Sequence, residues 1–276
     1  MVKVKKSVNG KPLPCEIYFD GYHKQYMDEG NTLVKKNWDF ITIVVGFEGS
    51  GKSRFCMTSS LYMDSKFSLE NIVFTPSEFL EAVDTLPNES VIMWDEADAL
   101  GNHHADTVKN LVMNKMQRIR DKNLKIFLVS PTMWMWGWYF VKHRTRGLFE
   151  IYAKGLQRGY FNFWDRDDKQ RLFDKGKRKK SYKAHKPTRY GRFVDIPDNF
   201  PVSIDEYRKK KAEATKSLTD NLKDPRTLKM KVRRKALPKL RKHFNQTELA
   251  DIFDVSVSLI SRDFKALDEQ KFVSVD

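Results

Sequence analysis

The chain has 276 residues and a formal net charge of +15. Its hydrophobic share of 40% and its charged share of 32% indicate a globular protein and exclude a chain that is disordered throughout. The longest apolar run, Met133–Val141, is far shorter than the roughly 20 residues of a membrane-spanning helix, so we expect no membrane anchor. Only two cysteines are present, and no apolar signal region follows the charged N-terminus, which predicts a cytoplasmic protein.

A short apolar run leads into the most informative motif of the chain. Phe40–Val45 is rich in β-branched residues and predicts a strand that is buried on both faces. The next eight residues, Gly46–Ser53, read GFEGSGKS and complete the phosphate-loop pattern G-x-x-x-x-G-K-S. Residues 54–63 continue as a predicted helix. A strand, a glycine-rich loop and a helix in this order predict the binding of a nucleoside triphosphate, with Mg²⁺ as its expected metal.

Each residue type in this loop has a physical reason. The glycines allow the backbone to approach phosphate oxygens closely, and the loop amides and the helix N-terminus favour an anion. Lys52 is predicted to reach the β- and γ-phosphates, and the Ser53 hydroxyl is predicted to hold Mg²⁺. The predicted nucleotide-binding residues are Gly46, Phe47, Glu48, Gly49, Ser50, Gly51, Lys52, Ser53 and Arg54.

A second buried strand ends in an acidic pair. Ser90–Trp94 is apolar and is followed directly by Asp95 and Glu96. Carboxylates at the carboxyl edge of a parallel sheet are what hydrolysis of a magnesium nucleotide requires, although such a pair is also common as a helix cap. We predict that Asp95 holds the Mg²⁺ shell together with Ser53, and that Glu96 polarises the attacking water. Lys52, Asp95 and Glu96 are the predicted catalytic residues.

A third buried strand, Leu124–Ser130, ends in a polar residue where such folds place a γ-phosphate sensor. Ser130 is therefore a sensor candidate. Four arginines are candidates for an arginine finger, which would contact the nucleotide bound by a neighbouring subunit: Arg118, Arg120, Arg144 and Arg146. Farther along, Leu148–Ala153 and Gly159–Trp164 predict two strands of a hairpin.

The stretch Met133–Phe140 reads MWMWGWYF and is unusually aromatic. Three interpretations remain open for it: packing in the core, contact between subunits, and stacking on the bases of a threaded strand. The first two are favoured.

Positive charge is concentrated in one zone. Residues 175–242 hold 24 Lys and Arg against 7 Asp and Glu, whereas residues 1–174 are nearly neutral. Such a zone favours contact with nucleic acid, and a solvated tail is the alternative. The run Lys177, Arg178, Lys179 and Lys180 is predicted to contact the DNA backbone. Ser203–Asn221 predicts a charged, exposed helix.

The last part of the chain changes character. Asn245 and Glu248 form a predicted capping box, and two short helices follow with a turn near Asp254. The predicted core consists of Leu249, Ile252, Phe253, Val255, Ile260, Phe264 and Leu267. Val257, Ser258, Ser261, Arg262 and Lys265 are left on the outer face, where a recognition helix meets DNA. A helix-turn-helix is predicted, and a helical hairpin that only packs is the alternative.

These motifs together carry a family resemblance. Residues 38–165 resemble an additional-strand P-loop ATPase of mobile elements and viruses, in the FtsK/HerA motor group that includes zonula-occludens-toxin-like and DNA-packaging ATPases. The resemblance is carried by Gly46–Ser53, Val91–Glu96, Leu124–Ser130 and Gly159–Trp164, with Ser130 where the group has a longer polar residue. Thr247–Leu267 is similar to helix-turn-helix regulators.

The resemblance implies an α/β fold with a central, mostly parallel sheet. It also implies an oligomeric, ring-forming motor that is driven by ATP and acts on DNA, with double-stranded DNA favoured. It places Lys52, Ser53, Asp95 and Glu96 at matching motif positions. The predicted division is an N-terminal extension (1–37), a P-loop ATPase domain (38–174), a basic linker (175–239) and a helix-turn-helix (240–276). A DNA translocase or packaging motor is the first hypothesis. A nucleotide-gated, sequence-specific DNA-binding regulator is the alternative, and a terminase is less favoured because residues 175–276 offer no nuclease-like carboxylate cluster.

Overall fold

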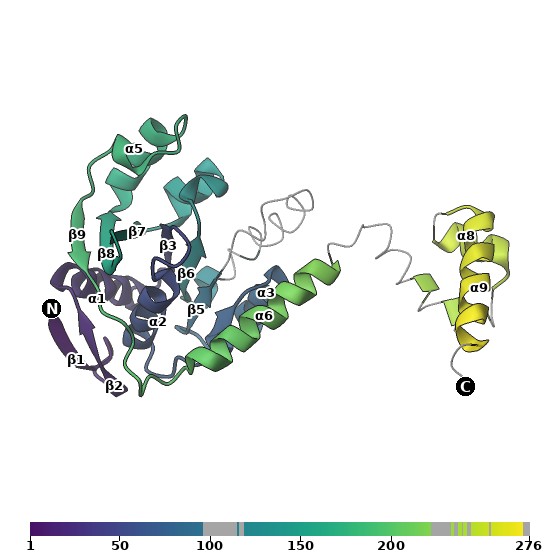
Figure 1. Ribbon diagram of the computed structural model, residues 1–276, viewed down its shortest axis with the longest axis horizontal. Helices are drawn as coiled ribbons and strands as arrows, with labels where there is room; N and C mark the ends of the chain where they lie inside the picture. The colour runs from purple at the N-terminus through teal and green to yellow at the C-terminus, as the bar shows by residue number, and fades with distance from the viewer. Residues whose placement is uncertain are drawn as a thin grey trace. The chain divides into compact units, whose positions relative to one another are not determined.

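A computed structural model describes residues 1–95, 115, 119–221, 233–234, 237–238, 240–241, 244–253 and 255–272. The chain divides into two compact units, Met1–Ala212 and Glu213–Asp276 (Figure 1). Of the predicted site residues, Glu96 and Arg118 lie outside the described residues. None of the helices in the described part of the chain has both the length and the hydropathy of a membrane span.

The first unit is built on a seven-stranded sheet with the strand order β4-β5-β6-β3-β7-β8-β9. The strands are β3 (Phe40–Gly46), β4 (Ile72–Val73), β5 (Val91–Trp94), β6 (Lys125–Ser130), β7 (Gly147–Lys154), β8 (Gln157–Trp164) and β9 (Arg189–Arg192). The pairs from β4 to β7 are parallel, and β8 and β9 are added antiparallel. The predicted mostly parallel α/β sheet and the β7–β8 hairpin are therefore confirmed.

Helices cover both faces of this sheet, which explains why β3 is apolar at almost every position. Ile41, Ile43 and Val45 pack in a core with residues of α3 (Pro76–Thr85) and α5 (Arg166–Gly176). The alternate residues face α1 (Gly21–Lys35), where Tyr26 contacts the Phe40 ring and hydrogen-bonds Thr42 across 2.8 Å. Residues 40–45 are all buried, as a strand covered on both faces requires.

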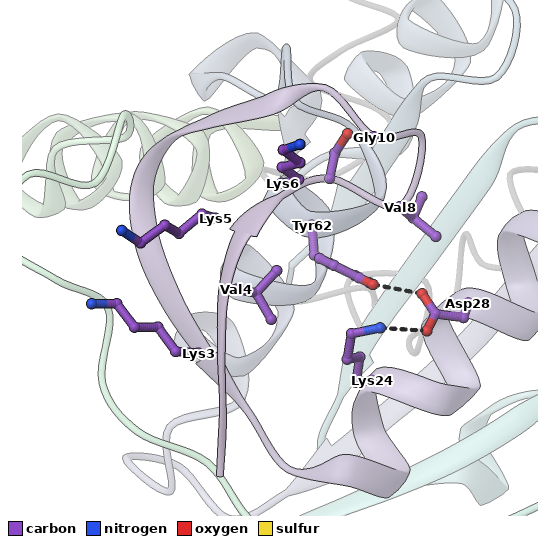
Figure 2. Close-up of a pocket in the computed structure, with 10 residues that line it drawn as sticks. Lys3, Val4, Lys5, Lys6, Val8, Gly10, Lys24, Asp28 and Tyr62 are labelled. Atoms are coloured by element: carbon purple, nitrogen blue, oxygen red, sulfur yellow. Dashed lines mark hydrogen bonds and ion pairs between the residues drawn. The ribbon is translucent and has the colours of Figure 1, made fainter.

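The chain begins with a separate two-stranded antiparallel sheet formed by β1 (Val2–Lys6) and β2 (Pro12–Phe19). This hairpin lies beside α1 and the end of α2 (Lys52–Met63), where a shallow cavity is lined by several lysines (Figure 2). There the Tyr62 hydroxyl donates a hydrogen bond to Asp28 across 2.5 Å, and Lys24 forms an ion pair with the same carboxylate across 2.7 Å.

The aromatic stretch 133–140 divides between core and surface. A 3₁₀ turn, η3 (Met133–Met135), and a π-helical turn, η4 (Phe140–Arg144), carry it over the sheet. Met133, Trp136 and Phe140 are buried in the core, so core packing is confirmed for these residues. Trp138 and Tyr139 are 58% and 51% exposed, so contact with a subunit or with bases remains a prediction for them alone.

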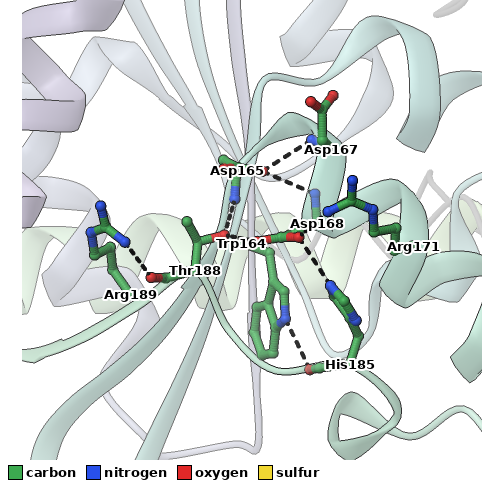
Figure 3. A network of polar contacts seen from close by, with 8 residues as sticks. All are labelled: Trp164, Asp165, Asp167, Asp168, Arg171, His185, Thr188 and Arg189. Atoms are coloured by element: carbon green, nitrogen blue, oxygen red, sulfur yellow. Dashed lines mark hydrogen bonds and ion pairs between the residues drawn. The ribbon is translucent and has the colours of Figure 1, made fainter.

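The segment after α5 returns to the sheet through a network of polar contacts (Figure 3). Asp168 accepts a hydrogen bond from the Thr188 hydroxyl across 2.7 Å and lies 3.0 Å from Nε2 of His185. Trp164 donates its indole N–H to the His185 carbonyl oxygen across 3.1 Å. These contacts surround the turn η5 (Tyr182–Ala184) and fix the entry to β9, which pairs with β8. The first part of the predicted linker thus belongs to the sheet.

The second unit contains α8 (Gln246–Ile252) and α9 (Val257–Phe272). The predicted capping box is confirmed, because Asn245 accepts from the amide of Glu248 and the Glu248 carboxylate accepts from that of Asn245. Leu249, Ile260 and Phe264 are buried as predicted. The prediction for Ile252 was wrong: it is 52% exposed, because the helix ends there and the side chain falls on the outer face.

A buried ion cluster adds to this small core. Asp263 of α9 is 2% exposed in its side chain and accepts from Arg233 across 2.5 Å and from Arg234 across 2.7 Å. Leu237 completes the apolar cluster. Residues from the predicted basic linker are therefore part of the fold of the second unit. The helix α6 (Ile204–Asn221) begins in the first unit and continues past the division after Ala212.

Candidate active site

The predicted phosphate loop joins the carboxyl end of β3 to the first turn of α2. Gly51 is the N-cap residue of α2 with φ 102°, a left-handed conformation that side chains disfavour, and no side chain among the described residues caps this helix N-terminus. A Cβ atom at Gly46 would collide with the carbonyl oxygen of Ile151 in β7. The backbone therefore requires glycine at both positions, and the amides of the first helical turn face the cavity rather than a capping side chain.

Lys52 lies inside the curl of this loop. Its Nζ donates hydrogen bonds to the carbonyl oxygens of Gly46, across 2.7 Å, and of Phe47, across 2.9 Å. Burial lowers the pKa of Lys52, the carboxylate of Asp95 raises it, and the positive charge of Lys211 lowers it further. A partly desolvated ammonium beside another cation is stabilised by any anion that enters the loop.

Ser53 and Asp95 meet at the edge of the sheet. The Ser53 hydroxyl donates to Oδ2 of Asp95 across 2.9 Å, and the Tyr207 hydroxyl of α6 donates to the same oxygen. Asp95 follows β5 and is 2% exposed. A serine hydroxyl and an aspartate carboxylate are hard oxygen ligands of the kind that Mg²⁺ takes in proteins, so the donor set fits the predicted metal.

A cavity of about 730 Å³ opens over these residues. Its walls come from the loop, the end of β6, the start of β8 and the chain after β9. Among the described residues, the lining contains five cations, Lys52, Arg54, Arg158, Arg208 and Lys211, and three anions, Glu48, Asp95 and Asp195. The excess of positive charge suits a polyanionic ligand.

Sequence reasoning missed the part of the wall that we call the covering segment, Phe193–Lys211. The Phe193 ring lies 5.3 Å from that of Phe55 in α2, and its backbone N–H donates to the Gly159 carbonyl across 2.8 Å. Asp195 forms an ion pair with Arg54 of α2.

The helical part of the covering segment was predicted to be an exposed helix, and this was wrong for Tyr207. Tyr207 is only 8% exposed. The signal that reveals this face is the spacing of Ile204, Tyr207, Arg208 and Lys211, which recur at three- and four-residue steps and all line the cavity.

Ser130, the sensor candidate, lines the cavity at the end of β6. Its hydroxyl donates to the Thr132 carbonyl oxygen across 3.3 Å and accepts from the Trp136 indole N–H across 3.3 Å. The serine is thus in the predicted place, and its hydroxyl is held by its own connecting turn.

The described finger candidates lie at the opposite end of β3. Arg144 forms an ion pair with Asp39 across 2.9 Å. The guanidinium groups of Arg146 and Arg120 lie 4.9 Å and 5.9 Å from the ring centroid of Trp38. Trp38 and Asp39 precede β3, whereas the phosphate loop follows it, so the structure does not bring these arginines to the cavity of their own chain.

The predicted DNA-binding residues are at the surface of their units. Lys177, Arg178, Lys179 and Lys180 are exposed in the turn after α5. On α9, Val257, Ser258, Arg262 and Lys265 are exposed and Ser261 is half-buried, whereas Ile260, Asp263 and Phe264 face inward. The predicted division of α9 into a packed face and an outer face agrees with these exposures.

Comparisons with known proteins assign no family to this chain. No protein-family model matches this sequence, and no curated protein matches it. Among solved structures, the chain is similar to the N-terminal domain of zonular occludens toxin from Neisseria meningitidis, with 13% sequence identity and a TM-score of 0.38. The match covers 59% of this chain and 97% of that one. A likeness at this level assigns no reaction and no partner to this chain.

Proposed function

We propose that the chain binds a nucleoside triphosphate with Mg²⁺ in the cavity above Gly46–Ser53 and hydrolyses it. The observation that carries the proposal is the pairing of Ser53 with Asp95, 2.9 Å apart, at the mouth of a glycine-bracketed loop that contains Lys52. Serine, lysine and aspartate are the groups that a triphosphate and its metal need, and they come from two different parallel strands whose carboxyl ends meet here.

Each residue of the proposed site has its own role in binding and hydrolysis. The amides of the loop and of the first turn of α2 hold the phosphate oxygens, and Lys52 turns from its loop carbonyls toward the β- and γ-phosphates. Ser53 and Asp95 would hold Mg²⁺, which when bound supplies neutralising charge to the β- and γ-phosphates. Glu96 is proposed to orient the attacking water, since it follows Asp95 in the sequence.

The strand order supports the additional-strand assignment within the P-loop proteins. β6 lies between β3, which carries the loop, and β5, which ends at Asp95. ATP is the proposed nucleotide because the resemblance of the four motifs is to ATPases. We extend the proposal to an oligomeric DNA translocase or packaging motor, supported by the charge excess of residues 175–242 and by the exposed face of α9.

A nucleotide-gated DNA-binding regulator is the second candidate. The contact of Tyr207 with Asp95 favours it, because the helix that carries Tyr207 includes residues of the second unit, from Glu213 to Asn221. In both candidates Arg262 and Lys265 of α9 would contact DNA, and the run Lys177–Lys180 would contact its phosphates.

The first test is equilibrium binding of ATP with Mg²⁺ and hydrolysis by the full chain. We expect Lys52→Ala to lower turnover by about 100-fold, since one pre-organised donor to the transferred phosphate is lost. Lys66→Ala is the matched control, because Lys66 is exposed beyond the end of α2 and outside the cavity. Equal turnover of Lys52→Ala and the wild type would refute the assignment.

A second test separates the two candidates. A motor should show hydrolysis stimulated by DNA of any sequence, whereas a regulator should show slow hydrolysis and a defined footprint. The footprint should disappear in Arg262→Ala and persist in Arg171→Ala, where an exposed arginine of α5 is removed. A chain that retains ATP hydrolysis but shows neither DNA response would keep the ATPase assignment and lose both DNA roles.

A further inference from the structure

The hydrogen bond between Tyr207 and Asp95 is unusual because it lies at the proposed metal position. Oδ2 of Asp95 accepts from two hydroxyls, that of Ser53 on one side and that of Tyr207 on the other. A carboxylate oxygen has two lone pairs, so these two donors satisfy this oxygen completely.

The two donors are not equivalent toward a cation. Ser53 can keep its proton on Asp95 while a lone pair of its own oxygen faces Mg²⁺, so its hydrogen bond is compatible with a metal. Mg²⁺ in proteins keeps several water molecules, and these waters donate to nearby carboxylates. Tyr207 therefore stands where such a water would donate to Asp95.

Packing holds Tyr207 in this place. Its ring lies 5.6 Å from the ring of Phe74, directly after β4. One helical turn later, Nζ of Lys210 donates to the carbonyl oxygens of Leu69, across 3.0 Å, and of Ile72, across 2.5 Å. The first turns of α6 are thus held beside the cavity at Tyr207 and at Lys210.

We propose that Tyr207 is a gate on the metal half of the site: its hydroxyl competes with the water shell of Mg²⁺ for Asp95, and binding of the magnesium nucleotide releases the start of α6. This inference rests on the proposed function, because it needs a nucleotide in the cavity. The released helix is the one that runs past Ala212, the last residue of the first unit, to Asn221.

The test compares equilibrium binding of a fluorescent ATP analogue to the full chain with Mg²⁺ and with EDTA. Tyr207→Phe keeps the ring and removes the competing hydroxyl. We expect this variant to bind the magnesium nucleotide about tenfold more tightly than the wild type does, and to bind the metal-free nucleotide with wild-type affinity. The reason is that the substitution removes a hydrogen bond to a charged group from the metal-free protein and removes none from the magnesium-bound protein.

The matched control is Tyr62→Phe at the far end of α2, which also removes a tyrosine hydroxyl from an aspartate, Asp28 of α1 (Figure 2). Its affinity for the magnesium nucleotide should equal that of the wild type. Hydrogen exchange of the amides at 204–212 gives an independent readout on the wild type: magnesium nucleotide should raise exchange there, and metal-free nucleotide should not.

Three results would overturn the proposed role of Tyr207. Equal or weaker binding of the magnesium nucleotide by Tyr207→Phe, with normal binding by the wild type, overturns the gate and leaves the nucleotide site intact. Unchanged exchange at 204–212 in the wild type also overturns it. Failure of the wild type to bind nucleotide under either condition overturns the gate together with the proposed function.

Discussion

Acid is expected to destabilise the first unit through one buried histidine. His23 of α1 is 1% exposed, stacks on Phe55 with ring centroids 4.2 Å apart, and lies with Nε2 2.8 Å from the Ser59 hydroxyl. Burial lowers the pKa of His23 to about 3. The folded protein therefore holds this imidazole neutral among aromatic rings, where a charge would be poorly solvated.

The sign and size follow from the two pKa values. An unfolded chain protonates His23 near its ordinary pKa of about 6.5, so between that pH and about 3 the unfolded state binds more protons. The stability that the neutral His23 contributes is fully present above the pKa of the unfolded state, about 6.5, and is lost as the pH falls from there toward about 3. Going from pH 7.5 to pH 5 should cost about 2 kcal/mol from this residue alone.

The assay is urea unfolding followed by tryptophan fluorescence at the two pH values. All six tryptophans lie in the first unit, so the signal reports that unit alone. The change in unfolding free energy between the two pH values should be about 2 kcal/mol smaller in His23→Gln than in the wild type. His143→Gln, at an exposed histidine, should keep the wild-type difference. If His23→Gln loses as much stability in acid as the wild type, the reasoning is refuted.

Three further predictions concern other buried groups and the loop. Burial lowers the pKa of Lys169 to about 7, so between this pH and about 10.5 the unfolded state binds more protons than the folded state. The free energy of unfolding should therefore rise by about 2 kcal/mol from pH 7 to pH 9. In urea titrations, Lys169→Met should flatten this rise. Asp263→Asn leaves Arg233 buried beside a neutral group and should lower the free energy of unfolding of the second unit by about 3 kcal/mol. Hydrogen exchange at 246–272 should increase, while the unfolding transition seen by tryptophan fluorescence stays unchanged. Unaltered exchange would contradict this prediction. Gly51→Ala puts a Cβ atom 3.1 Å from the Phe193 ring at φ 102° and should weaken ATP binding at least about tenfold, whereas Gly155→Ala, at φ 58° with open space around it, should bind ATP normally.

Features encoded by neighbouring residues could be predicted from the sequence. The run Phe40–Val45 gives a buried strand, and Gly46–Ser53 gives the turn that follows it, because both depend on local composition and glycine spacing. The capping boxes at Thr75 and Asn245 are likewise local, each being completed by a glutamate three residues later. The sequence placed Ser53 and Asp95 in one site because parallel strands end at one edge of a sheet.

Contacts between distant residues could not be predicted in this way. Tyr207 is the only aromatic residue of a highly charged helix, and nothing near it in the sequence indicates that it reaches Asp95, 112 residues earlier. Ile252 illustrates the reverse error: an apolar residue in a short amphipathic helix was assigned to the core, although the helix ends before its face is covered. Packing of the complete chain decides both cases.

The ion cluster around Asp263 has a consequence for how the protein would respond to ionic strength. Arg233 and Arg234 are engaged by this carboxylate, and Lys210 by two carbonyl oxygens, so part of the positive charge counted between residues 175 and 242 is already used inside the molecule. When a polyanion binds, each phosphate that is neutralised releases counterions, and the logarithm of affinity falls with the logarithm of salt in proportion to the phosphates contacted. A titration with sodium chloride should therefore give a gentler slope than the 24 cations of this zone suggest.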